Sequence, residues 1–97
     1  MPHLTVVATF TAKRGKEAQA KSALMALVAP TRAEQGCVNY DLHQDAADPR
    51  QFLFHENWTS KAELDRHLET PHIATLKAQV AELFDVGPTI SLWTKIA

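Results

Sequence analysis

The sequence predicts an α+β domain in which helices cover one face of a four-stranded antiparallel sheet. Three observations lead to this fold class. Some segments alternate apolar and polar side chains, which is typical of strands, and others carry an apolar side chain every three or four residues, which is typical of helices. These segments follow one another in the order β-α-β-β-α-α-β. Turn-forming residues separate them, at Gly15, Pro30, Gly36, Pro49, Pro71 and Gly87.

The first third of the chain is expected to form one strand and one helix. Residues 3–12 alternate between apolar and polar side chains, which predicts a strand buried on one face. Residues 16–28 place apolar side chains at helical spacing, which predicts an amphipathic helix. The apolar sets are Leu4, Val6, Ala8 and Phe10 for the strand and Ala20, Leu24, Leu27 and Val28 for the helix.

The middle of the chain is expected to form a β-hairpin. Residues 37–45 and 51–58 have the composition of strands, and the polar segment between them ends in Asp48-Pro49-Arg50. One register gathers the apolar side chains on a single face, and it is therefore the register we expect. It pairs Val38, Tyr40 and Leu42 with Trp58, Glu56 and Phe54, respectively.

The last third of the chain is expected to form two helices and a strand. Ser60 and Glu63 have the spacing of a capping box, which marks the start of a helix. Thr70 followed by Pro71 marks the start of another, which we expect to end at Gly87-Pro88. Its apolar stripe is Ile73, Leu76, Val80, Leu83 and Phe84, and the final strand, residues 89–96, places Ile90, Leu92 and Ile96 on one side. The complete order is that of a ferredoxin-like fold.

Composition limits the classes of function. The 97 residues, 45% hydrophobic and 22% charged, fit a single domain over residues 1–97. A net charge of −1 does not favour nucleic acid as a partner. The longest apolar run is residues 23–29, whereas a membrane helix needs about 20 residues, so no membrane span is expected. Cys37 is the single cysteine and no secretory leader is visible, so we expect a cytoplasmic protein.

The second face of the sheet is expected to bind another copy of the chain. Val7, Leu53 and Trp93 project from this face in the predicted register. A face exposed to water has little reason to carry a tryptophan, so we interpret it as a homodimer interface. Isolated apolar residues on a monomer surface are the alternative.

The helix-facing side of the sheet is the predicted site of chemistry. Glu56 lies there, and a carboxyl group in such surroundings is hydrogen-bonded or has a raised pKa. Alternatively, Glu56 reaches water at the sheet edge or pairs with a helix residue. Five of the seven aromatic residues share this face, namely Phe10, Tyr40, Phe52, Phe54 and Trp58.

His67 and His72 are the candidate bases. Both are predicted to look toward the sheet on either side of the Thr70-Pro71 kink, although histidines in such places also occur as hydrogen-bonded core residues. No metal site is expected, because the two histidines are five residues apart and do not share a helical face. On the other face, Asp41, His43 and His55 also lack a ligand motif. Cys37 is expected to be structural.

The sequence resembles the antibiotic biosynthesis monooxygenase family, in particular its small quinol-monooxygenase-like members. The resemblance rests on six segments of the sequence, residues 6–13, 30–32, 36–37, 40–45, 52–58 and 67–72. It implies a dimeric α+β barrel that oxygenates a quinol, phenolic or polyketide-type aromatic ring with O₂ and needs no flavin, haem or metal. It also implies roles for site residues: Glu56, His67 and His72 in proton transfer, and Tyr40, Phe54, Trp58 and Phe10 in contact with the small aromatic substrate.

Two other functions remain open from the sequence. The same acid–base pair suits an isomerase or lyase acting on a small carbonyl compound, because the family also contains non-oxidative members. The same pocket also suits a non-catalytic dimer that binds an aromatic ligand, with Glu56 only orienting it.

Overall fold

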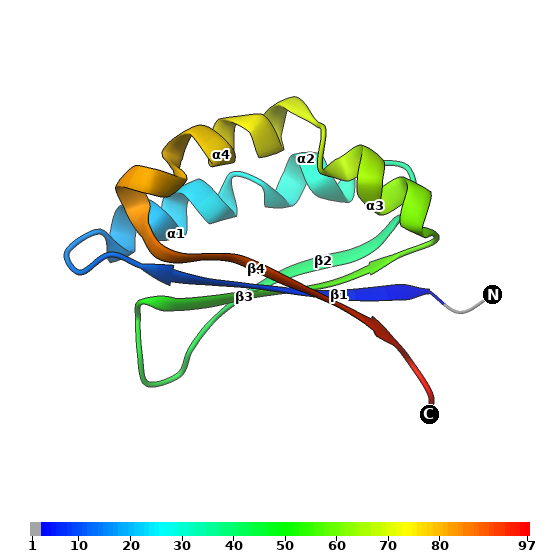
Figure 1. Ribbon diagram of the computed structural model, residues 1–97, viewed down its shortest axis with the longest axis horizontal. Helices are drawn as coiled ribbons and strands as arrows, with labels where there is room; N and C mark the ends of the chain where they lie inside the picture. Colours follow the sequence, from blue (N-terminus) through cyan, green and yellow to red (C-terminus); the bar gives the residue numbers. More distant parts are fainter. Residues whose placement is uncertain (1–2) are drawn as a thin grey trace.

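The computed structural model describes residues 3–97 and contains one antiparallel sheet with the strand order β2-β3-β1-β4. All helices lie over the same face of this sheet (Figure 1). The predicted α+β, ferredoxin-like fold is therefore confirmed. No helix within residues 3–97 is long and apolar enough to cross a membrane. In chain order the elements are β1 (Leu4–Ala12), α1 (Glu17–Met25), α2 (Val28–Arg32), β2 (Cys37–Gln44), β3 (Gln51–Trp58), α3 (Lys61–His67), α4 (Pro71–Leu83) and β4 (Phe84–Thr94).

The first helical segment is divided, whereas the sequence predicted one helix over residues 16–28. Helix α1 ends at Met25, and the chain resumes as α2 from Val28 to Arg32. Pro30 did not end the helical structure because it is the third residue of α2. The first N–H groups of a helix have no partner within the helix, so a proline there loses no hydrogen bond. Helix α2 extends the helical layer toward the start of β2.

The hairpin register is correct at its centre and wrong at one end. Tyr40 pairs with Glu56 and Leu42 with Phe54, as predicted. Val38 does not pair with Trp58, because the register shifts between positions 37 and 39 and Cys37 takes that place. The irregularity leaves Val38 47% exposed. A bulge inserts one residue and so moves all side chains beyond it to the other face.

The fourth helix ends earlier, and the fourth strand begins earlier, than the sequence predicted. Helix α4 stops at Leu83, and Phe84 is extended, with φ −123° and ψ 139°. Phe84 pairs with Ala12 of β1, and its ring centroid lies 5.1 Å from that of Phe10. Burial against the sheet therefore overrides the helical spacing of Phe84. Ile96 lies beyond the end of β4.

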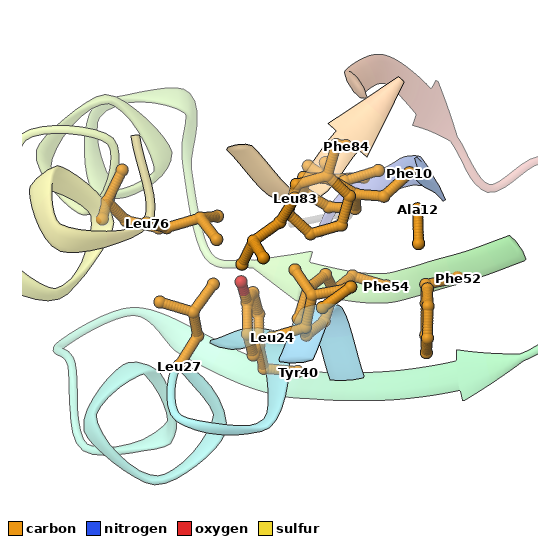
Figure 2. Packing of buried hydrophobic residues seen from close by; sticks show 14 of the residues in the cluster. Phe10, Ala12, Leu24, Leu27, Tyr40, Phe52, Phe54, Leu76, Leu83 and Phe84 are labelled. Carbon is orange, nitrogen blue, oxygen red and sulfur yellow. The ribbon is translucent and has the colours of Figure 1, made fainter. Parts of the chain in front are cut away.

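The core lies between the sheet and the helices, and aromatic rings from β1, β2 and β3 form its centre (Figure 2). The rings of Tyr40 and Phe54 are stacked with centroids 4.4 Å apart, and Phe10 meets Phe54 edge-on at 6.2 Å. The five aromatic side chains predicted for this face are all buried: Phe10, Tyr40, Phe52, Phe54 and Trp58. This aromatic layer forms the floor of the candidate site.

Candidate functional site

A cavity of about 240 Å³ lies between the sheet and helices α3 and α4. Its volume is slightly below the roughly 300–1,000 Å³ that is typical of pockets for drug-sized ligands, so it suits a small molecule. Most of its wall is apolar. The polar or charged side chains that border it are Tyr40, Glu56, His67 and Lys77.

The cavity collects most of the predicted site residues from four different elements. Phe10 of β1, Tyr40 of β2 and Phe54 and Glu56 of β3 line it from the sheet, and His67 lines it from α3. Two predicted residues are not part of the wall. Trp58 is fully buried beside Glu56, and His72 lies at the start of α4.

Glu56 is a buried carboxyl group beside the cavity. It is 3% exposed, and the indole Nε1–H of Trp58 donates a hydrogen bond of 2.9 Å to its Oε1. Burial raises the pKa of Glu56 to about 7; the hydrogen bond from Trp58 lowers the pKa by less than burial raises it, and the charge of Glu34 adds a smaller rise. Glu56 can therefore exchange a proton with a ligand near neutral pH.

Tyr40 places a phenol group at the wall of the cavity. The residue is 2% exposed, and its ring stacks on Phe54. Burial raises the pKa of Tyr40, and the nearby Glu56 carboxyl raises it further. The hydroxyl group thus keeps its proton at neutral pH and can donate a hydrogen bond.

His67 and His72 converge on one carboxylate oxygen. Oε2 of Glu34 accepts hydrogen bonds from Nδ1 of His67 at 2.8 Å and from Nε2 of His72 at 2.7 Å. The break between α3 and α4 makes this possible, because one histidine ends α3 and the other lies in the first turn of α4. Both histidines face inward as predicted, but only His67 reaches the cavity.

The environment of His67 favours the neutral imidazole. The residue is 2% exposed, and its ring centroid lies 4.7 Å from that of Trp58 and 5.4 Å from that of Tyr40. Burial lowers the pKa of His67, although the hydrogen bond and the charge of Glu34 act in the opposite direction. A neutral imidazole can accept a proton, which a general base must do.

Glu34, His67 and His72 are also the residues of this site that could hold a metal. Their ligand atoms lie within 4.8 Å of one another, and two imidazoles with a carboxylate suit divalent transition metals. Zinc lies about 2.0–2.1 Å from each nitrogen ligand, with no proton on the coordinating nitrogen. In the structure the same atoms are joined directly by hydrogen bonds of 2.7–2.8 Å, so the three residues form a hydrogen-bonded cluster. The sequence excluded a metal site because the two histidines are five residues apart, and that argument was wrong, since the break between α3 and α4 brings both onto one carboxylate.

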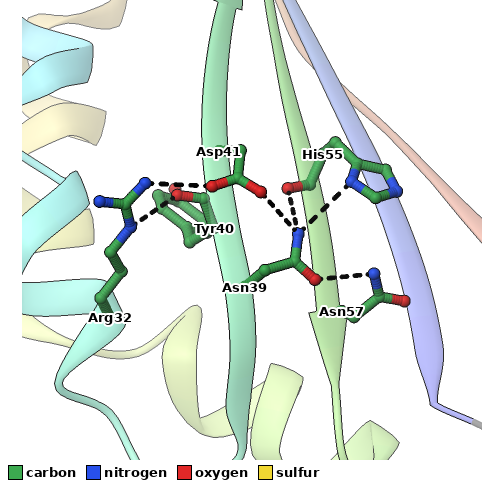
Figure 3. A network of polar contacts seen from close by, with 6 residues as sticks. All are labelled: Arg32, Asn39, Tyr40, Asp41, His55 and Asn57. Carbon is green, nitrogen blue, oxygen red and sulfur yellow. Dashed lines mark hydrogen bonds and ion pairs between the residues drawn. The ribbon is translucent and has the colours of Figure 1, made fainter.

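A second polar network lies on the outer face of the sheet, which is the face opposite the helices. Nδ2 of Asn39 donates to Oδ2 of Asp41 and to the backbone oxygen of His55, both at 3.0 Å, and Asn57 donates to Asn39 at 2.8 Å. Arg32 pairs with Asp41 at 3.0 Å. Figure 3 shows these side chains joined across β2 and β3. Asp41 and His55 lie on the face predicted for them, away from the cavity.

Cys37 is half-buried at the start of β2. Burial, followed by the charges of Glu34 and Glu56, raises the pKa of its thiol to about 11. The thiolate is the reactive form of cysteine, so this environment does not favour a nucleophile at neutral pH.

Comparison with known proteins places the chain in a family. The sequence profile of the antibiotic biosynthesis monooxygenase family matches residues 3–79. The chain belongs to this family. A Mycobacterium tuberculosis protein named a "putative monooxygenase" is 36% identical over 80 residues, which cover 82% of this chain and 78% of that protein.

Solved structures agree with the family assignment. A crystal structure from Pseudomonas aeruginosa is 38% identical and has a TM-score of 0.95, covering 100% of this chain and 97% of the other. Another, described as an antibiotic biosynthesis monooxygenase, is 31% identical with a TM-score of 0.89, covering 97% and 99%. The resemblance predicted from the sequence is therefore confirmed.

Two residues of this antibiotic biosynthesis monooxygenase domain are added to the site by the structure. Glu34 lies in the connection between α2 and β2, where neither helical nor strand spacing indicates a direction for its side chain. Lys77 lies on α4 and borders the cavity. The sequence could have indicated this position for Lys77. It lies four residues after Ile73 of the apolar stripe, and residues i and i+4 share a helix face.

Proposed function

We propose that the protein is a cofactor-independent monooxygenase that oxygenates a quinol, phenolic or polyketide-type aromatic ring with O₂. The observation that supports this most directly is the cavity, in which aromatic walls meet two groups suited to proton transfer, Glu56 and His67. Membership of the family and the name of the mycobacterial relative support the reaction class.

The chemistry needs little from the protein because the substrate itself supplies the electrons. A base removes a proton from the electron-rich ring system, and the resulting anion reacts with O₂. At a ring methylene group of a polyketide-type substrate, two C–H bonds break and one C=O bond forms, while the second oxygen atom leaves with two hydrogens as water. On a quinol ring, one C–H and two O–H bonds break, the attacked carbon gains a hydroxyl group and the two phenolic carbons become carbonyls, while the second oxygen atom again leaves as water. This is a four-electron oxidation of the substrate and a four-electron reduction of O₂, so no external reductant enters the balance.

Each wall residue has a role in this proposal. Phe10 and Phe54 pack against the substrate ring, and the Tyr40 hydroxyl donates a hydrogen bond to the developing oxyanion. Lys77 adds positive charge at the border of the cavity. Trp58 holds the carboxyl group of Glu56 through its indole N–H and does not contact the substrate.

Oxygen consumption by metal-free protein, measured with a panel of quinols and polyphenols, tests the proposal. We expect uptake above the rate of autoxidation, and Glu56→Gln should lower it by at least about 100-fold, the lower range for loss of general acid–base catalysis. Glu69→Gln, the same change at an exposed position between α3 and α4, is the control and should leave uptake unchanged. Absence of uptake with the whole panel would contradict the proposal, and equal turnover under nitrogen would indicate an isomerase or lyase.

We also propose that the protein acts as a homodimer joined through the outer face of the sheet. Trp93 of β4 is 58% exposed there, opposite Thr5 in the neighbouring strand. Strand β4 is also an edge of the sheet, so its outer side and its free backbone edge are both available to a second copy. This pairing would join two sheets into the α+β barrel that the resemblance implies.

A further inference from the structure

Glu34 dictates where the protons of the two histidines lie. Its Oε2 is within hydrogen-bonding distance of Nδ1 of His67 and Nε2 of His72. A carboxylate oxygen only accepts hydrogen bonds, so both of these ring nitrogens must carry the donated proton. The neighbouring carboxylate therefore assigns the tautomer of each ring.

The assigned tautomer determines which nitrogen of His67 can act as a base. A neutral imidazole has one N–H, and in His67 this proton is on Nδ1, facing Glu34. The other nitrogen, Nε2, then holds the lone pair. Since the His67 side chain borders the cavity, the ring offers a proton acceptor to a ligand there.

We propose that Glu34 is the positioning residue that fixes His67 in the tautomer with a free Nε2, so that His67 accepts the proton of the substrate bound in the cavity. This inference rests on the proposed function for the identity of the reaction. In the step itself, the substrate O–H or C–H bond breaks and an N–H bond forms at Nε2. The electron pair of the broken bond stays on the substrate anion, and the proton on Nδ1 remains in place.

The same contacts stabilise the product of this step. Protonated His67 carries a positive charge, and the Glu34 carboxylate lies 2.8 Å from its Nδ1. His72, whose side chain is 20% exposed, donates the second hydrogen bond and holds the carboxylate in this position. The neighbouring rings of Trp58 and Tyr40 limit rotation of the imidazole. Glu34 thus acts through His67 without touching the substrate.

Nuclear magnetic resonance of ¹⁵N-labelled histidine rings tests the tautomer without any substrate. At pH 8 we expect His67 of the wild-type protein to show a protonated Nδ1 and an unprotonated Nε2. In Glu34→Gln this preference should weaken, because the neutral amide can donate as well as accept. Glu69→Gln, at an exposed position after α3, is the matched control and should leave the His67 signals unchanged. A wild-type His67 protonated on Nε2 would overturn the proposal, whether or not Glu34→Gln folds.

Kinetics then test whether the tautomer matters for turnover. With a substrate identified by oxygen uptake, Glu34→Gln should lower kcat by about 100-fold or more, within the range for a disturbed general base, and change KM by less than about threefold. An unchanged kcat with an altered tautomer would overturn the positioning role. If the wild-type protein shows the expected tautomer but consumes no oxygen, the proposed function is overturned, and with it the role of Glu34 in that reaction.

Discussion

At the scale of a single residue, Glu56 makes the free energy of unfolding depend on pH. Its pKa rises from 4.5 to about 7 on folding, mainly because of burial, so the native state binds its proton more tightly than the unfolded state. Stability is therefore lost as the pH rises from 4.5 through 7, by about 3 kcal/mol when complete. Glu56→Gln removes this loss and keeps an oxygen that accepts the hydrogen bond from Trp58.

Urea unfolding at pH 5, 6.5 and 8 measures this effect. The stability of Glu56→Gln relative to the wild type should increase steadily with pH, by up to about 3 kcal/mol. The comparison cancels the contribution of His67, whose lowered pKa has the opposite effect because stability is lost as the pH falls below 6.5. Glu69→Gln, an exposed carboxyl change, should show a constant difference. A constant difference for Glu56→Gln would contradict the buried, proton-binding carboxyl.

The two histidines should differ in their importance for turnover. Only His67 borders the cavity, whereas His72 contacts Glu34 from the far side. We expect His67→Ala to lower kcat by about 100-fold or more. His72→Ala should lower it by less than about tenfold, because it removes only one support of the Glu34 carboxylate. Steady-state oxygen uptake measures kcat for both variants. A loss of kcat that is greater in His72→Ala than in His67→Ala would contradict this assignment and indicate that His72 is the base.

Residue-level prediction succeeded where strand alternation fixes the direction of a side chain. Alternation placed Tyr40, Phe54 and Glu56 on the inner face, and the structure confirms all three positions. Glu34 was not predicted because it lies in an irregular connection, and its hydrogen-bond partners are 33 and 38 residues away. Contacts of that kind depend on how the connection between α2 and β2 packs against α3 and α4, and they cannot be read from local spacing.

At the scale of elements, the turn between α2 and β2 determines how closely α3 approaches the sheet. Gly36 has a φ of +87°, and a Cβ atom there would lie 2.4 Å from Cγ and 2.6 Å from Cβ of Glu63, on α3. Gly36→Ala therefore combines backbone strain with a displacement of α3. Gly15→Ala is a matched control, because Gly15 has a φ of +83° and no neighbouring atom within 4 Å of a Cβ.

We expect Gly15→Ala to lower the free energy of unfolding by about 1 kcal/mol and Gly36→Ala by about 3 kcal/mol, values that span the usual cost of a strained backbone position. Urea unfolding gives both. Gly36→Ala should also reduce oxygen uptake, because moving α3 moves His67, while Gly15→Ala should not. Equal losses of stability in the two variants would indicate that α3 adapts to the added methyl group without cost.

Element boundaries were harder to predict than element types. The sequence predicted every strand, but helix α4 was expected to include Phe84, and Val38 was expected to face inward. Both differences arise from pairing with another strand. Phe84 is extended because it pairs with Ala12, and Val38 is displaced by a bulge against β3. Hydrophobic spacing within one segment contains no information about either partner.

At the scale of the whole molecule, β4 is the least covered strand of the sheet. Ile90 and Leu92 lie on its inner face, opposite Ala8 and Val6, yet they remain 43% and 47% exposed. Trp93 projects from the outer face and is 58% exposed. Apolar side chains are thus open to water on both faces of the strand, next to a cavity that Ile90 also borders. A second copy placed on this strand would bury this surface and enclose the site.

Replacing Trp93 tests this assembly. Trp93→Glu places a charge in the proposed interface, where an unpaired charge is costly to bury, and should convert the dimer to a monomer at micromolar concentration. Met25→Glu is the control, because Met25 is 56% exposed but lies on α1 in the helical layer. Light scattering coupled to size exclusion should give a dimer for the wild type and Met25→Glu and a folded monomer for Trp93→Glu. A monomeric wild-type protein would contradict the dimer, and a dimeric Trp93→Glu variant would place the interface elsewhere. In either case the exposed side chains of β4 would need another partner.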